Sequence, residues 1–182
     1  GRTAGFPKEL YDRPCKRTVL QDYLIRNFGR QIDQVSFRAH GSGKSGLISV
    51  TRCGQEVLER TACTIDEKNG DIIVRFEVGF PANGRTINAG ELIKILYEYL
   101  PDCVENSLCY RKLDRSKVQK VMELSVDQEY IQTHLEEMGL VAFVADGSVL
   151  PRESGVSQRP MKGAVAFQSP DSMKVTMHLP YY

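Results

Sequence analysis

The sequence lacks any apolar run near the ~20 residues that span a bilayer, and no signal-peptide pattern opens it. These absences argue against membrane and secreted proteins. Of its 182 residues, 41% are hydrophobic and 26% charged, a mixture that argues against disorder or a fibrous structure. We therefore expect a cytoplasmic, globular protein. The glycine at position 1 suggests an internal boundary or a processed tag, so we expect a fragment of a longer protein.

Metal-binding and redox patterns are also scarce. The five cysteines are odd in number and include no C-x-x-C pair, and the three histidines are isolated from one another. A structural zinc site needs ligands paired at short spacing, so we expect no metal. The cysteines are instead typical of small, partly buried thiols in a reducing compartment. They are Cys15, Cys53, Cys63, Cys103 and Cys109.

The net charge is only +1, which by itself indicates no partner. Its distribution is uneven, because residues 1–60 hold 11 Lys and Arg against 6 Asp and Glu. A basic N-terminal third could face phosphate groups. An ordinary solvated surface with a local imbalance explains the same numbers, and both interpretations stay open.

The first half of the chain predicts a helix followed by strands. After Pro14, apolar residues recur at helical spacing up to Ile32, and the charged residues of this stretch, Asp22 among them, are placed mostly on the opposite face. Residues 47–50 resemble a strand. Residues 61–66 and 71–78 flank Asn-Gly, which predicts a hairpin with a type I′ turn.

The second half predicts further helices and strands. A capping box at residues 88–91 begins a helix with a buried stripe of Leu92, Ile93, Leu96, Tyr99 and Leu100, and Pro101 ends it. A second capping box at 125–128 begins a helix that runs to a C′ glycine, Gly139. Residues 140–145, 164–167 and 174–179 are expected to be strands.

This order of elements predicts an α+β fold. We expect a largely antiparallel sheet with a central hairpin, packed with about three to four helices. No repeat or linker divides the sequence. We therefore expect a lead-in segment over residues 1–14 and a single domain over residues 15–182.

Residues 43–45, Gly-Lys-Ser, resemble the end of a P-loop, whose glycines let backbone amides surround phosphates. The pattern requires a glycine at the position of Arg38, and a helix where residues 46–50 predict a strand. Asp146, which follows an apolar run, precedes a turn-like sequence. We interpret the loop as a connection between strands, and no residue is assigned as catalytic.

Four segments resemble one family, the predicted ATPases of the ABC class. They are residues 54–61, 79–85, 140–155 and 165–170, the last followed by a strand-like stretch ending at Leu179-Pro180. The family includes bacterial proteins and a kinetoplastid mitochondrial ATPase associated with RNA editing. The resemblance covers the chain from about Cys15 to its end.

This resemblance implies that the full protein binds and hydrolyses ATP with Mg²⁺, and it raises RNA contact as a further expectation. The family's glycine loop lies beyond the point where this sequence ends, so no cofactor is expected for the chain alone. The expected partner is the ATP-binding domain of the same polypeptide, with a homodimer of the full protein implied. A kinetoplastid relative would reside in the mitochondrial matrix rather than the cytoplasm.

Five cations are the candidate phosphate or RNA contacts. Arginine carries a planar, permanently charged fork that suits phosphate, although it also braces loops against carbonyls and carboxylates. No exposed aromatic residue for base stacking is evident, since Tyr23 and Phe28 fall on the buried helical stripe. The candidates are Arg60, Arg85 and Arg152 in the resembling segments, with Lys44 and Arg38 beside the glycine-rich loop.

The residues therefore support three functional hypotheses. The first is an accessory, non-catalytic N-terminal domain of an ABC-class ATPase. The second is a stand-alone RNA-binding module that uses the basic N-terminal third. The third is a self-contained nucleotide-binding domain that uses residues 43–45.

Overall fold

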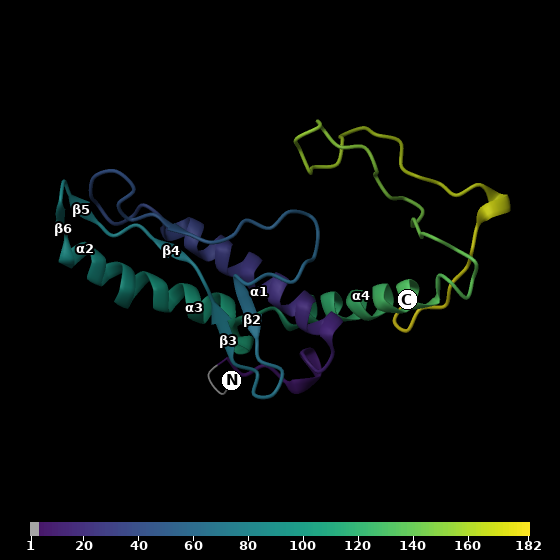
Figure 1. Ribbon diagram of the computed structural model, residues 1–182, viewed down its shortest axis with the longest axis horizontal. Helices are drawn as coiled ribbons and strands as arrows, with labels where there is room; N and C mark the ends of the chain where they lie inside the picture. Colours follow the sequence, from purple (N-terminus) through teal and green to yellow (C-terminus); the bar gives the residue numbers. More distant parts are fainter. Residues whose placement is uncertain (1–3) are drawn as a thin grey trace. The chain divides into compact units, whose positions relative to one another are not determined.

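The computed structural model describes residues 4–182, and its contacts divide the chain into two compact units. Unit 1 is Gly1–Met122 and unit 2 is Glu123–Tyr182 (Figure 1). The prediction of one domain over residues 15–182 stays a prediction. No helix among the described residues is both long enough and apolar enough to cross a bilayer.

The helix α1, Pro14–Val35, provides five residues of the buried core of unit 1, which are Leu20, Leu24, Ile25, Phe28 and Ile32. Proline suits its first turn, where the backbone N–H would lack a partner. The predicted stripe is confirmed, with Phe28 at its centre fully buried. Asp22, expected on the solvent side, is instead 4% exposed, because two arginines pair with it. The short helix η1, Lys8–Leu10, adds Leu10 to the same core.

Three antiparallel two-stranded ladders complete the α+β fold, which confirms the predicted class. The hairpin β2–β3 is confirmed, with Thr64 opposite Ile73. Residues 77–78 leave that hairpin and pair with the first strand, so the predicted strand over 71–78 is two strands. The ladders are β1 (Ile48–Ser49) with β4 (Glu77–Val78), β2 (Cys63–Ile65) with β3 (Ile72–Val74), and β5 (Ala82–Asn83) with β6 (Thr86–Ile87).

The predicted type I′ turn between β2 and β3 is wrong. That turn requires positive φ at both central residues, whereas here Gly70 has a φ of 72° and Asn69 does not share it. The connection is longer, because the Asp66 amide donates to the Asp71 carbonyl across it. The Asp66 carboxylate accepts bonds from the amides of Lys68 and Asn69, and this side-chain capping favours the wider loop.

Residues 89–108 form one continuous helical stretch, so the predicted stop at Pro101 is wrong. It comprises α2 (Ala89–Lys94), the π-helical turn η2 (Ile95–Tyr99) and α3 (Leu100–Leu108). Proline lacks an amide hydrogen and its ring collides with the carbonyl one α-turn earlier. The wider π turn just before Pro101 relieves both problems.

The same turn explains why the predicted stripe of this helix is partly wrong. Ile93 and Leu96 are exposed, whereas Ile95 is fully buried and faces the core. A stripe drawn with 3.6 residues per turn loses its phase where one turn holds an extra residue.

The last long helix is α4, Arg115–His134, and it runs straight through the predicted second capping box. It begins earlier because the Asp114 carboxylate accepts bonds from the amides of Ser116 and Lys117. The predicted C′ role of Gly139 is confirmed. With a φ of 67°, it closes the turn as its amide reaches Glu136 and the amide of Leu140 reaches Leu135. The short helix η3, Tyr110–Lys112, precedes α4.

The strands expected at residues 140–145, 164–167 and 174–179 are wrong. Within the described part of unit 2, residues 140–182 hold one isolated bridge, Arg152 with Pro160, and the short helix η4, Asp171–Met173. Val141 and Val165 are almost fully exposed. An apolar run becomes a strand only where a neighbouring strand completes its hydrogen bonds. Phe167 exchanges two backbone bonds with Gly147 and Ser148, but no strand extends from that pair in the described chain.

Candidate functional site

The glycine-rich loop at residues 41–46 is bound along the segment that leads into β5 and β6. The amide of Gly46 donates to the carbonyl of Gly79 at 2.9 Å, and the Gly79 amide donates to the carbonyl of Leu47 at 2.7 Å. The Ser42 amide donates to the Ala82 carbonyl at 2.7 Å. The two segments, about forty residues apart in sequence, therefore form one hydrogen-bonded unit, which we call the loop cluster (residues 38–46 and 79–91).

Two serine hydroxyls fasten the loop cluster internally. The Ser45 hydroxyl donates to the Ser42 carbonyl at 2.5 Å and accepts from the Ala82 amide at 3.0 Å. The Ser42 hydroxyl accepts from the Gly84 amide at 3.1 Å. Ser45 is buried, so its hydroxyl belongs to the scaffold of the loops rather than to their surface.

Close backbone approach explains two of the glycines. A Cβ on Gly79 would collide with the carbonyl oxygen of Lys44, and a Cβ on Gly41 would collide with the Ser45 side chain and the Ala82 carbonyl. Only glycine lets the two segments lie this near. The resembling segment at residues 79–85 therefore has a structural reason for its first residue.

Helix α2 is tied to the same loops through Glu91. The predicted cap is half confirmed, because the Asn88 side chain accepts from the Glu91 amide at 3.3 Å. The reciprocal bond is absent, since the Asn88 amide donates to Pro81. The Glu91 carboxylate instead accepts from the His40 amide at 3.0 Å and from the Lys94 ammonium at 2.6 Å. Both bonds lower the pKa of Glu91, and the bond from Lys94 has the larger effect.

Acidification is expected to release this tether. A carboxylate whose folded pKa is lowered stabilises the fold above its ordinary value of 4.5, and that contribution disappears as the pH falls through the folded pKa. Hydrogen exchange at the His40 amide, corrected for its intrinsic pH dependence, should accelerate below about pH 4.5. Glu91→Gln should show little of this change, and equal pH dependence in both proteins would contradict the assignment.

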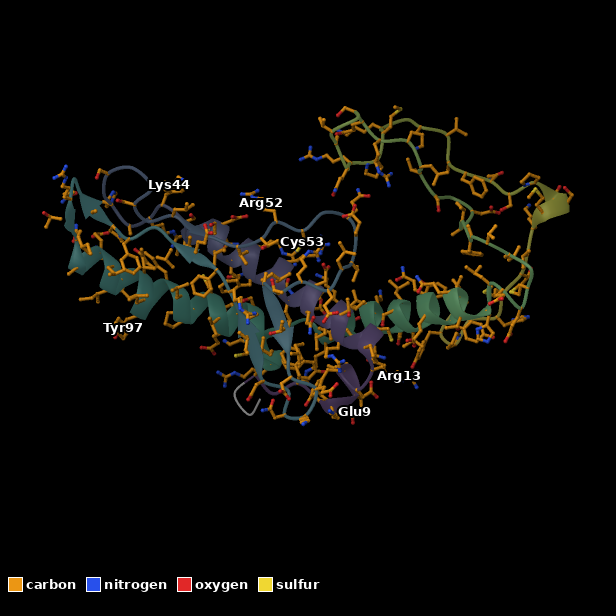
Figure 2. All side chains as sticks on the ribbon, in the orientation of Figure 1. Glu9, Arg13, Lys44, Arg52, Cys53 and Tyr97 are labelled. Atoms are coloured by element: carbon orange, nitrogen blue, oxygen red, sulfur yellow. The ribbon has the colours of Figure 1, made fainter. Side chains whose placement is uncertain are left out.

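The loop cluster brings together three of the five predicted contacts, Arg38, Lys44 and Arg85. All three are exposed, and none of their side chains has a hydrogen bond or ion pair with a described residue. Lys44 projects outward from the glycine-rich loop (Figure 2). Arg85 occupies the turn between β5 and β6, after Gly84 with its φ of 63°.

The other two predicted contacts lie elsewhere and are bound to the protein itself. Arg60 is 15% exposed, pairs with Asp22 and donates to the Glu56 carbonyl at 3.1 Å. Arg152, in unit 2, donates to the Val149 carbonyl at 2.9 Å. Both side chains therefore brace loops in the described structure.

The geometry of residues 43–45 does not fit a nucleotide. A P-loop leads into a helix and leaves its Ser or Thr hydroxyl for Mg²⁺. Here the loop leads into β1, and the Ser45 hydroxyl is already bonded within the loop cluster. Among the residues that the structure describes, no three His, Cys, Asp or Glu side chains form a group that could hold a metal.

Comparison with known families identifies the chain. Residues 1–111 match the family model described as ATPase of the ABC class N-terminal, and residues 114–182 match a model described as P-loop domain. The chain belongs to the ATPases of the ABC class. The recognition from sequence segments is thereby confirmed. No match to a curated protein was found.

The two family matches divide this ABC-class ATPase chain at residues 112–113, just before α4. The N-terminal domain predicted over residues 15–182 spans parts of both matches. The loop cluster lies wholly within the N-terminal match, and Arg152 lies within the P-loop domain match.

The expectation that no exposed aromatic side chain is evident is wrong, because Phe37, Phe80 and Tyr97 are among those exposed. Phe37 is 60% exposed. It lies two residues after the end of α1, in a stretch for which the sequence predicts no regular element. The only sequence signal was its place directly after a helix end and before the glycine-rich loop.

Proposed function

We propose that this chain is an accessory, non-catalytic part of an ABC-class ATPase, and that its loop cluster contacts the phosphate backbone of RNA. In this proposal the full protein binds and hydrolyses ATP with Mg²⁺ through the rest of its P-loop domain, on the same polypeptide. The same proposal includes a homodimer of the full protein, because ABC-class ATPases generally act as dimers.

The observation that carries the RNA contact is the set of three exposed cations, without a hydrogen bond or ion pair to a described residue, on two segments that backbone bonds join. No ion pair with a described residue has to be broken before Arg38, Lys44 or Arg85 can contact a phosphate. Hydrogen bonds fix the loops that carry these three residues. Three of the four cations on α1 are less available. Lys16, Arg17 and Arg26 each pair with a carboxylate, at 3.2, 3.4 and 2.5 Å respectively.

Binding of single-stranded RNA should be weak, independent of sequence and steeply dependent on salt. Three phosphate contacts give a slope of about −2 in a plot of log affinity against log salt concentration. The variant Arg38→Ala, Lys44→Ala, Arg85→Ala should lose most of that slope. Fluorescence anisotropy of a labelled oligouridine from low to high salt measures it.

A matched control removes the same charge from other exposed positions. The variant Lys68→Ala, Lys120→Ala, Lys162→Ala loses three lysines that lie outside the loop cluster. Its plot of log affinity against log salt concentration should keep the wild-type slope. Equal losses in the two variants, or affinity that is flat with salt, would remove the RNA contact from the proposal.

The non-catalytic role predicts that Mg-ATP does not bind at residues 43–45 of this chain. Calorimetric titration with Mg-ATP should give no binding heat, and Lys44→Ala should behave identically, because the Ser45 hydroxyl is occupied. Heat that disappears with Lys44→Ala would show that the chain has its own nucleotide site.

A further inference from the structure

A second surface of unit 1 carries an aromatic side chain beside arginines. A groove of about 620 Å³ runs between the C-terminal half of α1 and the segment 47–53. Its lining includes Phe37, Arg30 and Arg52, with Gly29 and Val50 among the residues of its walls. Figure 2 shows Arg52 and Cys53 on the segment that runs beside α1.

Phe37 is held in an unusual backbone conformation at this groove. Its φ is +64°, and among the described residues it is the one non-glycine residue with positive φ. A bulky side chain there is strained, since its Cβ crowds the backbone. The surroundings enforce the conformation, because the Phe37 amide donates to Gly46 at 2.7 Å and the Ile48 amide donates to the Ser36 hydroxyl at 3.0 Å.

Packing does not explain this strain. Phe37 is 60% exposed and is not part of the buried core or of the shell packed against it. Glycine would adopt the same backbone at lower cost. A phenyl ring kept in a strained, solvent-facing position lacks a structural purpose in the described chain, and strain of this kind clusters at ligand contacts.

The arginines of the groove supply the complementary charge. Arg52 is 92% exposed and has a distant partner, the Asp33 carboxylate at 3.9 Å. Arg30 is exposed, and among the described residues it hydrogen-bonds only to the neutral Asn27 side chain. Exposed pairs at such separations contribute little, so both guanidinium groups can turn to phosphate. The third arginine, Arg26, is already committed to Asp22 at 2.5 Å.

We infer that the groove binds single-stranded nucleic acid, with one base stacked on Phe37 and the flanking phosphates contacted by Arg30 and Arg52. An aromatic ring beside cations is the arrangement that accepts unpaired bases irrespective of their identity. A paired base has its faces covered within the duplex, so a duplex does not fit. Phe37 also directly precedes Arg38, which joins the groove to the loop cluster. The inference therefore rests on the proposed function and extends it to a base-stacking position.

The chain has no tryptophan, which makes Phe37→Trp a single, site-specific reporter. A base stacked on the indole should quench its fluorescence as oligouridine or oligothymidine is added, at an affinity near wild type. A duplex of mixed sequence should quench it far less. Quenching by both the ribose and the deoxyribose oligonucleotide identifies base stacking as the common interaction. Equal quenching by the duplex would overturn the inference.

Phe37→Gly separates stacking from folding. It removes the strained side chain, so stability in urea should be kept or raised, while oligouridine binding weakens about tenfold. With these two contacts added to the three of the loop cluster, the salt slope becomes about −3.5, and Arg30→Gln and Arg52→Gln should each reduce it by about 0.7. Asp33→Asn should tighten binding, because it frees Arg52.

The outcomes distinguish this inference from the proposed function. If Phe37→Gly binds as tightly as wild type while the variant lacking Arg38, Lys44 and Arg85 does not, the stacking position is wrong and the RNA contact of the loops stands. If Phe37→Trp is unquenched by bound oligonucleotide, the stacking position is wrong as well. If wild type binds no oligonucleotide, both proposals fail.

Discussion

Asp22→Ala is expected to lower the free energy of unfolding of unit 1 by about 2–4 kcal/mol, because it removes a buried carboxylate that pairs with two arginines. Asp22 is 4% exposed and accepts bonds from Arg26 at 2.5 Å and from Arg60. Its removal leaves two arginines without their carboxylate, one of them mostly buried. Both guanidinium groups keep some exposure, which holds the loss below that of a wholly buried pair.

Urea unfolding monitored by circular dichroism measures this loss. The matched control is Asp33→Ala on the same helix, whose carboxylate is 63% exposed and pairs with Arg52 at 3.9 Å. That change should cost less than about 0.5 kcal/mol. Similar losses at the two positions would show that the Asp22 pair contributes no more than a surface contact.

Gly79→Ala is expected to cost about 3 kcal/mol and to abolish binding at the loop cluster. The new Cβ would meet the backbone carbonyl of Lys44, and a backbone atom cannot move aside as a flexible side chain can. The two bonds that join Gly79 to Gly46 and Leu47 would break with it. The segments that hold Lys44 and Arg85 would then lose bonds that join them.

Gly90→Ala is the control for this change. Its Cβ would lie 3.6 Å from the Asn88 side chain, an ordinary contact, and the residue is helical. The substitution should leave stability unchanged or raise it by up to about 1 kcal/mol. Denaturant midpoints and oligouridine affinity for both variants test the pair. A Gly79→Ala protein that folds and binds normally would refute the close approach.

Local patterns were sufficient for the elements whose determinants lie within a few residues. The stripe of α1, the β2–β3 pairing and the closing role of Gly139 depend on spacing or on one backbone conformation, and all three are confirmed. The family was also accessible, because its segments are contiguous.

Long-range contacts were not accessible. Nothing in the sequence around Glu91 shows that its carboxylate bonds to His40, fifty-one residues away, instead of completing a capping box. The same applies to Asp22, whose burial depends on Arg60 from a distant loop. The apolar run at residues 140–145 has the composition of a strand, but composition does not supply the neighbouring strand that a ladder needs.

For the candidate site, the sequence could not show which of the five predicted cations lie on joined segments. Arg38, Lys44 and Arg85 meet because backbone bonds join two segments, whereas Arg60 turns inward to a carboxylate. The exposure of Phe37 could not be predicted, because the residue has a left-handed backbone conformation that the neighbouring residues in the sequence do not indicate.

The π-helical turn at Ile95–Tyr99 has a consequence for the azimuth of α2. One residue of an α-helix corresponds to a rotation of about 100° and a rise of about 1.5 Å. Deleting a single residue within η2 would restore regular winding but turn α2 by that angle about its axis relative to α3. Asn88 and Glu91 would then point away from residues 38–46. The extra residue in this turn thus acts as a rotational offset that aims the Glu91 carboxylate at the His40 amide.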